Sequence, residues 1–283
     1  MTIECVANCA NRLGESAVWD WRTGRFVWVD IENAVLFELD EAAGDLIRHP
    51  MPERIGAVGL RQGGGFVLAL ASGFATFDPV TGAIQPIGQI SLPPECRLND
   101  GRVDHQGRFW AGAMSEVDRF DAPLFRLDPD HAIHLMREGI GCSNSISFSP
   151  DGEHMYFTDT RQGEIERYDL APDGAIGPAQ PFARSPANPD GSTVDASGCL
   201  WNAVWNDWSI RTYAETGELI GRLELPVQRP TSCAFGGPDL DRLYITTAIW
   251  DLTLEELEQQ PLAGSVLAIN LAVSGLPEPE FRG

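Results

Sequence analysis

Short apolar runs alternate with polar residues along the whole chain, and turn residues separate them. Residues 17–20 read Ala-Val-Trp-Asp and residues 26–30 read Phe-Val-Trp-Val-Asp, with Thr-Gly-Arg at 23–25. Such alternation, bounded by Gly or Asp, predicts two strands joined by a tight turn. Only residues 252–260 carry a helical pattern, and they predict a short surface helix. The chain is therefore predicted to be all-β.

This hairpin pattern occurs six times. Successive turns are separated by 40, 43, 45, 46 and 43 residues, at Gly24, Gly64, Gly107, Gly152, Gly198 and Asp241. A period of this length is typical of a four-stranded propeller blade, whereas the coils of a parallel β-helix are shorter. We therefore predict a six-bladed β-propeller that forms a single domain over residues 1–283. The ring could close by pairing residues 3–6 with residues 265–269.

Charge and composition narrow the possible partners. The 283 residues include 41 acidic and 20 basic side chains, for a formal net charge of −21. This balance would repel nucleic acid and anionic membranes, so neither is expected as a partner. No signal peptide or membrane span is predicted, and the six dispersed cysteines favour reduced thiols in a cytoplasmic protein. The oligomeric state stays open.

Four of the hairpins carry a polar side chain near the start of the first strand, where an apolar one is expected. Glu15 lies nine residues before its turn glycine, and Asn99, Asn144 and Asp190 lie eight residues before theirs. Asn and Asp often only cap turns, but a shared spacing favours a shared position at the channel of the propeller. Carboxylate and amide oxygens together predict a site for Ca2+, Mg2+, Mn2+ or Fe2+.

Six segments of the chain match, in order, the motifs of a known family. The segments are residues 13–20, 97–104, 111–114, 143–152, 189–191 and 231–237. The first of them reads Leu-Gly-Glu-Ser-Ala-Val-Trp-Asp. On these motifs the chain resembles the SMP-30/gluconolactonase/regucalcin family over nearly its whole length. It departs from the family at residues 16–17, which read Ser-Ala where the family more often has Gly-Pro.

The resemblance implies a six-bladed propeller that holds one divalent metal ion and hydrolyses a small-molecule sugar lactone. Ca2+ is the first choice of ion, with Zn2+, Mn2+, Mg2+ and Fe2+ as alternatives. The roles that it implies are Glu15, Asn144 and Asp190 as metal ligands, Asp190 also as the acid/base group, and Arg97 and Asn99 as substrate contacts. Glu116 lies near a further substrate-binding acid of the family, although loop 117–123 leaves this alignment open.

The chemistry of lactone hydrolysis needs residues of these types. A divalent cation polarises the carbonyl and lowers the pKa of water, and a carboxylate can move the proton to the departing ring oxygen. We therefore expect a carboxylic ester hydrolase that opens an aldonolactone in sugar catabolism. The alternatives are a non-catalytic calcium-binding regulatory protein, a hydrolase of a non-sugar lactone or ester, and an interaction platform. Arg97 with Asn99 favours the enzyme, and loops 117–123 and 205–209 would select the lactone.

Overall fold

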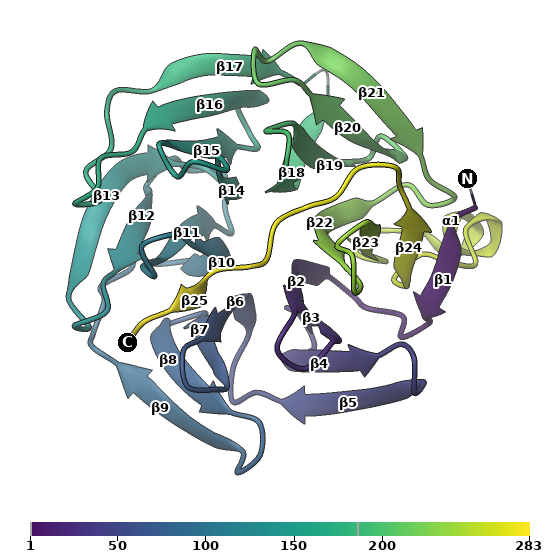
Figure 1. The fold of residues 1–283 in the computed structure, drawn as a ribbon, viewed down its shortest axis with the longest axis horizontal. Helices are drawn as coiled ribbons and strands as arrows, with labels where there is room; N and C mark the ends of the chain where they lie inside the picture. The colour runs from purple at the N-terminus through teal and green to yellow at the C-terminus, as the bar shows by residue number, and fades with distance from the viewer. Residues whose placement is uncertain (1, 186) are drawn as a thin grey trace.

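The computed structural model describes residues 2–185 and 187–283, and it confirms a six-bladed β-propeller (Figure 1). Five sheets have four strands and one has five. Each blade starts with an inner strand beside the central axis and continues outward by antiparallel pairing. This arrangement brings the six inner strands together, although they are far apart in the sequence.

The strands of the first three blades follow one another along the chain. Their bounds are β2 (Gly14–Asp20), β3 (Arg25–Asp30), β4 (Val35–Asp40) and β5 (Asp45–Pro50) in blade 1, β6 (Ile55–Arg61), β7 (Phe66–Leu70), β8 (Gly73–Asp78) and β9 (Ala83–Ile87) in blade 2, and β10 (Cys96–Val103), β11 (Phe109–Ser115), β12 (Ala122–Leu127) and β13 (Ile133–Ile140) in blade 3.

The last three blades repeat this order until the chain closes the ring. Their bounds are β14 (Ser143–Phe148), β15 (His154–Asp159), β16 (Glu164–Asp169) and β17 (Gln180–Arg184) in blade 4, β18 (Asn188–Val194), β19 (Leu200–Trp205), β20 (Ser209–Tyr213) and β21 (Leu219–Glu224) in blade 5, and β22 (Pro230–Gly236), β23 (Arg242–Thr247), β24 (Val266–Asn270) and β1 (Glu4–Ala7) in blade 6.

The ring closes where the sequence predicts. Strand β1 pairs antiparallel with β24, with Glu4 opposite Ala268 and Cys5 opposite Leu267. The first strand of the chain therefore completes the last blade. The expected surface helix is α1 (Leu254–Gln259), which begins at Thr253 in a capping box. Among the described residues, no helix is long and apolar enough to cross a membrane.

Every inner strand contains a β-bulge close to its start. In β2, Glu15 pairs with Val29 and Val18 pairs with Val27, so two residues of β2 lie opposite one residue of β3. The other five inner strands also have one extra residue at this point. A bulge changes the direction in which one side chain points and increases the local twist of the strand. It therefore lets neighbouring residues of one strand point into the same space.

The C-terminal residues 271–283, which we call the strap, run across the ring (Figure 1). They end in the short strand β25 (Glu280–Phe281), which pairs parallel with the inner strand β6. Phe281 is fully buried against core residues of blades 2 and 3. The sequence did not predict this strand, because two residues carry no readable alternation.

The core lies mainly between neighbouring blades. Between blades 1 and 6, the rings of Phe26 and Tyr244 stack at 4.6 Å, and Trp19 stacks on Tyr244 at 5.6 Å. Large apolar areas removed from water supply most of the stability of such a contact.

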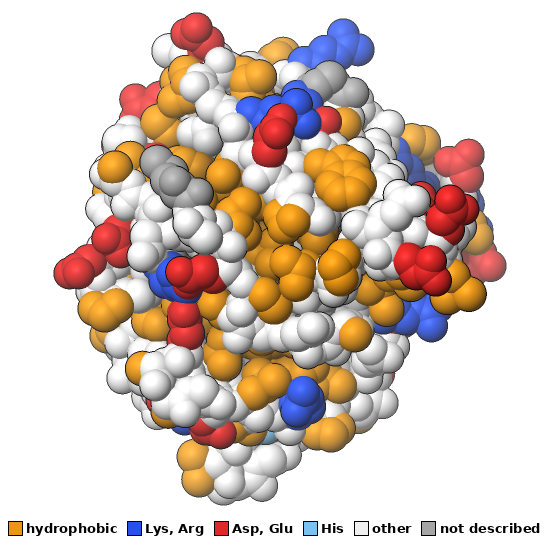
Figure 2. Space-filling model, turned by 90° about the vertical axis from the view of Figure 1, so that its right-hand side faces the viewer, with side chains coloured by type: hydrophobic (Ala, Val, Ile, Leu, Met, Phe, Trp, Pro, Cys, Tyr) orange, Lys and Arg blue, Asp and Glu red, His pale blue; other side chains and the backbone are white. Residues whose placement is uncertain are grey.

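On the side of the molecule drawn in Figure 2, acidic side chains occur singly or in small groups rather than as one acidic face.

Candidate metal centre and active site

A cavity of about 350 Å³ lies at the end of the ring where the inner strands begin. Its lining includes every residue that the sequence singled out, namely Glu15, Arg97, Asn99, Glu116, Asn144 and Asp190. It also includes Met114, Cys142, Thr160, Arg161, Trp205 and Trp250. The structure therefore brings the predicted residues together, while their chemical roles stay predictions.

The bulges decide how these side chains reach one cavity. Glu15 and Asn144 stand opposite Val29 and Thr158 on the neighbouring strands. Asn99 and Asp190 lie one place further along, inside their bulges, and have no partner in the ladder. Asn99 and Asp190 are thus offset by one position from Glu15 and Asn144, although the sequence predicted one shared position. The bulge makes this possible, because it provides an extra inward-facing position in each strand.

The residues directly after two of the candidate ligands have unusual backbone angles. Ser16 follows Glu15 with φ of +53°, and Ser145 follows Asn144 with φ of +62°. This left-handed region favours glycine, and residues other than glycine are strained there. It explains why the resembling family more often has Gly at the place of Ser16. Here the Ser16 hydroxyl accepts a hydrogen bond from Val58 N at 2.9 Å, which ties blade 1 to blade 2.

Hydrogen bonds orient the Asn144 amide. The hydroxyl of Thr160 donates to the carbonyl oxygen of Pro189 at 2.8 Å, so it can only accept from Asn144. Asn144 Nδ2 donates to Thr160 Oγ1 at 2.8 Å, and Asn144 Oδ1 accepts from Asn99 Nδ2 at 3.3 Å. The amide oxygen therefore lies on the side of Asn99, with a lone pair free for a cation.

Two buried acids lie side by side in this cavity. Glu15 and Asp190 are each 6% exposed, and both line this cavity. Burial, and to a lesser extent the charge of the nearby Asp100, raise the pKa of Glu15 to about 8. Burial and the charge of Glu15 likewise hold the pKa of Asp190 well above its usual value. Without a cation, the site resists carrying both negative charges.

Asp100 is a third acid close to this pair. Burial raises its pKa to about 6, and its Oδ2 accepts a hydrogen bond from Ile146 N at 2.7 Å. This bond links the inner strand of blade 3 to that of blade 4. Asp100 thus increases the negative potential that a cation at Glu15 and Asp190 would neutralise.

The donor set fits a divalent cation that prefers oxygen. Glu15, Asp190 and the Asn144 oxygen supply hard ligands, and a cation between them would relieve the repulsion of the two carboxylates. Cys142 also lines the cavity, but burial raises its pKa to about 12, so it stays a neutral thiol and a poor ligand. No cluster of three or more His, Cys, Asp or Glu suited to a metal occurs among the described residues, so the fit depends on the amide.

Arg97 is a buried cation without an acidic partner. Its Nη1 donates to Asn99 Oδ1 at 2.7 Å and to the Leu98 carbonyl at 3.1 Å, while its buried Nε has no hydrogen-bond partner in the described chain. Burial lowers the pKa of this guanidinium. A buried donor without a partner favours an anion or a polar ligand in the cavity.

Asn99 is more fully occupied than the sequence suggested. Its Nδ2 donates to the Ser143 carbonyl at 3.0 Å and to Asn144 Oδ1, and its oxygen accepts from Arg97. Both amide hydrogens are therefore used, and a substrate hydroxyl could only donate to the remaining lone pair of Oδ1. In these contacts Asn99 orients Arg97 and Asn144.

Glu116 lies at the rim of the cavity and is held by Arg54. Two hydrogen bonds of 2.5 and 2.9 Å join the carboxylate to the guanidinium, and this pair lowers the pKa of Glu116. Arg161 holds the following loop by donating to the carbonyls of Ser115 and Val117. Sequence reasoning missed Arg54 and Arg161, since arginines in loops carry no signal of their own.

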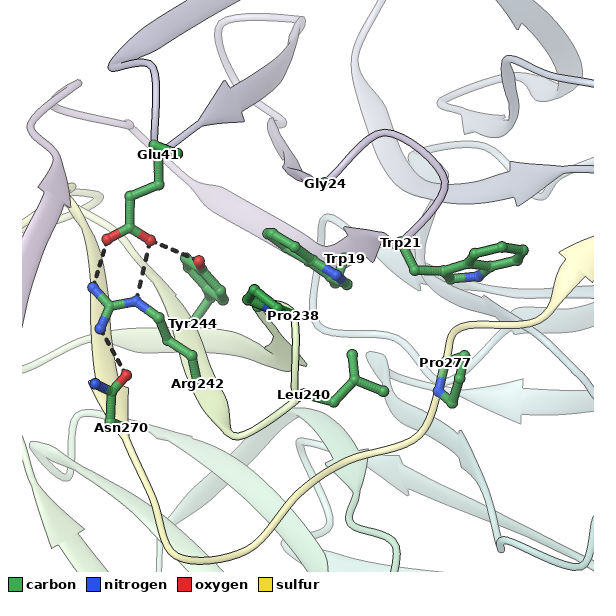
Figure 3. A pocket seen from close by; sticks show the side chains of 12 residues that line it. Trp19, Trp21, Gly24, Glu41, Pro238, Leu240, Arg242, Tyr244, Asn270 and Pro277 are labelled. Atoms are coloured by element: carbon green, nitrogen blue, oxygen red, sulfur yellow. Dashed lines mark hydrogen bonds and ion pairs between the residues drawn. The ribbon is translucent and has the colours of Figure 1, made fainter.

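A larger cavity of about 860 Å³ lies near the opposite ends of β2 and β22, between blades 1 and 6 (Figure 3). Trp19, Trp21 and Leu240 form much of its apolar wall. Its one acid, Glu41, already accepts from Arg242 and Tyr244 at 2.6 Å each. This cavity therefore has volume but no carboxylate free for chemistry.

Comparison with known proteins agrees with this geometry. A family model described as SMP-30/Gluconolactonase/LRE-like region matches residues 13–249. A 6-deoxy-6-sulfogluconolactonase of Pseudomonas putida is 38% identical over 288 residues, which cover 100% of this chain and 99% of the relative. An L-arabinolactonase of Azospirillum brasilense is 36% identical over 286 residues, which cover 98% of this chain and 95% of the relative.

Solved structures give the same result. A calcium-binding regucalcin from Agrobacterium tumefaciens superposes with a TM-score of 0.95 at 30% identity, covering 99% of this chain and 97% of that chain. The family model spans most of the residues, and the relatives match over nearly their whole length. The chain therefore belongs to the SMP-30/gluconolactonase family.

Proposed function

We propose that this sugar lactonase binds one divalent cation through Glu15, Asn144 and Asp190 and hydrolyses an aldonolactone to the aldonic acid. Two relatives named as sugar lactonases, at 38% and 36% identity, support the class of enzyme. The observation that carries the proposal is the pair of buried carboxyl groups beside an oriented amide oxygen. Such a set is destabilising unless a cation occupies it.

Lactone opening would use the residues in distinct roles. A bound divalent cation supplies Lewis-acid polarisation of the carbonyl and lowers the pKa of water. Asp190 accepts a proton from the attacking water as the new carbon–oxygen bond forms, and it returns this proton to the ring oxygen as the ring bond breaks. With a cation bound, Glu15 would be ionised beside it and would help to hold the cation.

Arg97 and Asn99 would orient the sugar. The guanidinium of Arg97, which lines the cavity, can donate to a substrate oxygen and favours negative charge that develops there. The remaining lone pair of Asn99 can accept from a substrate hydroxyl. Trp205 and Trp250 line the same cavity and offer apolar faces to the carbon–hydrogen side of a sugar ring.

A non-catalytic calcium-binding protein is the second candidate, because the matching structure from Agrobacterium tumefaciens is described as calcium-binding. The same three ligands would serve that role. The two functions differ in what they need from the rest of the cavity. Calcium binding alone needs neither the unpartnered Arg97 nor space for a substrate.

The proposal is tested with a panel of five- and six-carbon aldonolactones, followed by acid release against an enzyme-free blank. Chelator should abolish turnover, and adding back Ca2+, Zn2+, Mn2+ or Mg2+ one at a time should restore it. Asp190→Ala and the near-isosteric Asp190→Asn should lower kcat at least about 100-fold while the protein stays folded. Cation binding without turnover of any lactone would instead support the calcium-binding function.

A further inference from the structure

The strap is anchored to the turns at the end of the ring opposite the candidate metal centre. It forms hydrogen bonds with the inner hairpin turns of five blades. These bonds are Trp21 Nε1 to Glu278 O, Gln62 N to Phe281 O, Arg282 N to Gly107 O, Ala196 N to Ser274 O, and Leu271 N and Gly275 N to the carbonyls of Asp241 and Leu240.

One side chain of the strap reaches a mostly buried cation of the inner strands, Arg102. The carboxylate of Glu278 lies 3.1 Å from Arg102 Nη2, and the two side chains are 12% and 11% exposed. Among the described acids, only Glu278 lies within ion-pair distance of Arg102. A guanidinium with so little water around it depends on this partner, because burial of an uncompensated charge costs several kcal/mol.

Arg102 also joins two other inner strands. Its Nη1 donates to the Ser192 carbonyl in blade 5 at 2.9 Å, and its Nη2 donates to the Ala17 carbonyl in blade 1 at 3.4 Å. Arg102 itself lies on β10 of blade 3. One guanidinium therefore connects the inner strands of three blades across the centre of the ring.

These contacts lie next to the candidate ligands along the chain. Ala17 is two residues after Glu15, Ser192 is two residues after Asp190, and Arg102 is three residues after Asn99. Each intervening segment contains the β-bulge of its strand. Displacement of the bonded carbonyls would therefore move the carboxylates of Glu15 and Asp190 relative to each other.

We propose that Arg102 is a positioning residue for the cation site and that the strap holds it in place through Glu278. This inference rests on the proposed cation site, but the positioning itself concerns only residues of this chain. Residues that orient ligands without touching the metal typically change affinity by about 10- to 100-fold. The far side of the ring thus controls the spacing of Glu15 and Asp190.

The first measurement is the Kd for Ca2+ by calorimetry on protein stripped with chelator. Arg102→Met keeps the length of the apolar stem but removes the bonds, and it should raise Kd roughly 10-fold. Glu278→Gln should act in the same direction, and Arg102→Lys should recover part of the affinity. Glu280→Gln is the matched control, since Glu280 lies on the same strap but pairs with Arg22 at 3.1 Å, and its Kd should equal that of the wild type.

The sign of the change separates positioning from simple charge. Loss of a cation near the site would by itself attract Ca2+ more strongly, so tighter binding by Arg102→Met would overturn the proposal. Equal affinity of wild type and Arg102→Met would also overturn it. A role in stability alone would lower Tm without changing Kd.

Amide hydrogen exchange on the calcium-free protein gives a second readout that needs no metal. Arg102→Met and Glu278→Gln should speed exchange in residues 14–20 and 188–194 by roughly 3- to 10-fold, whereas Glu280→Gln should not. If wild-type protein binds no cation, the proposed function fails while this measurement still tests the positioning. Unchanged exchange in both segments contradicts the positioning, whatever the calorimetry shows.

Discussion

At the scale of single residues, Thr160 controls which atom Asn144 presents to the cavity. The Thr160 hydroxyl is committed as a donor to the Pro189 carbonyl, so the Asn144 nitrogen must face it. The amide oxygen then lies on the side of Asn99, in the cavity that Glu15 and Asp190 also line. Thr160 thus selects which atom of Asn144 is presented as a ligand, although it supplies no ligand of its own to the proposed site.

Replacement of Thr160 by valine should therefore weaken cation binding. The Thr160→Val change keeps the shape of the side chain but removes the acceptor that orients Asn144, and Kd should rise roughly 10-fold. Calorimetry on chelated protein measures the change.

Thr158→Val is the control for this experiment. Thr158 lies two residues earlier, in β15, and does not line the cavity; its hydroxyl donates at 2.6 Å to the Glu164 carbonyl. Both variants should lose about 1 kcal/mol of stability, but only Thr160→Val should lose affinity. Equal Kd values for the two variants would argue against an orienting role of Thr160.

The sequence could predict Glu15, Asn144 and Asp190 as site residues because each replaces an apolar residue near the start of a strand. It could not predict Arg54 or Thr160. These residues acquire their roles through contacts between neighbouring strands or blades, and a polar residue in a loop or at the end of a strand is common. Their roles depend on distances in space, which the spacing of residues along the sequence does not give.

At the scale of elements, the bulge of each inner strand determines what its blade contributes. In blades 1, 3, 4 and 5 the bulge region carries a carboxylate or amide into the cavity. In blade 2 the extra residue is Gly56, which packs directly on the backbone of Leu98 and Asn99 in blade 3. Blade 2 therefore allows the close approach that places Asn99.

A side chain at position 56 should disturb both the packing of blade 2 on blade 3 and the candidate metal centre. A Cβ there would lie 2.6 Å from the Leu98 carbonyl oxygen and would also collide with that of Asn99. Backbone atoms cannot yield as a side chain can, so Gly56→Ala should lower the free energy of unfolding by about 1–3 kcal/mol. Denaturant unfolding measures the loss, and cation affinity should fall with it.

Gly73→Ala provides the control in the same blade. Its Cβ would meet only Ile90 Cγ1 at 3.7 Å, an ordinary contact distance. This variant should be as stable as the wild type within about 0.5 kcal/mol. Tolerance of alanine at both positions would show that the close approach of blades 2 and 3 is not required.

The hairpins were predictable from the sequence, whereas the bulges were not. Alternation of apolar and polar residues and the residues of the turns, five of them marked by glycine, locate all six inner pairs of strands. A bulge shifts the register by one residue, and in a strand buried on both faces the shift leaves no visible change in pattern. The sequence therefore could not show that Asn99 and Asp190 lie one position further along their strands than Glu15 and Asn144 do.

At the scale of the whole molecule, the two ends of the chain stabilise the ring in different ways. Strand β1 completes blade 6, which the apolar run at residues 3–6 allowed the sequence to predict. The strap crosses the ring and is held by hydrogen bonds to the turns of five blades and by the pairing of β25 with β6. It lacks a repeating pattern, so only the structure reveals it.

Removal of residues 1–7 should open the ring at blade 6. Strand β24 is buried along most of its length, and loss of β1 would expose its edge. We expect a loss of about 2 kcal/mol or more, together with self-association at high concentration. Thermal unfolding and light scattering measure the two effects.

A peptide of residues 2–9 should restore the Tm of the truncated chain by adding a strand to the free edge. A peptide with Val6 and Ala7 replaced by aspartate is the control, since it cannot bury these two side chains. An unchanged Tm after truncation would mean that β1 contributes nothing to closure.

The pairing of β1 with β24 also affects biosynthesis. On the ribosome, Glu4–Ala7 emerges about 260 residues before its partner Val266–Asn270. At about 5–20 residues per second, the nascent chain waits on the order of ten to fifty seconds. Until β24 is made, β1 has no partner in its own chain, so crowded polysomes would favour strand-exchanged dimers in which each copy receives its last strand from the other.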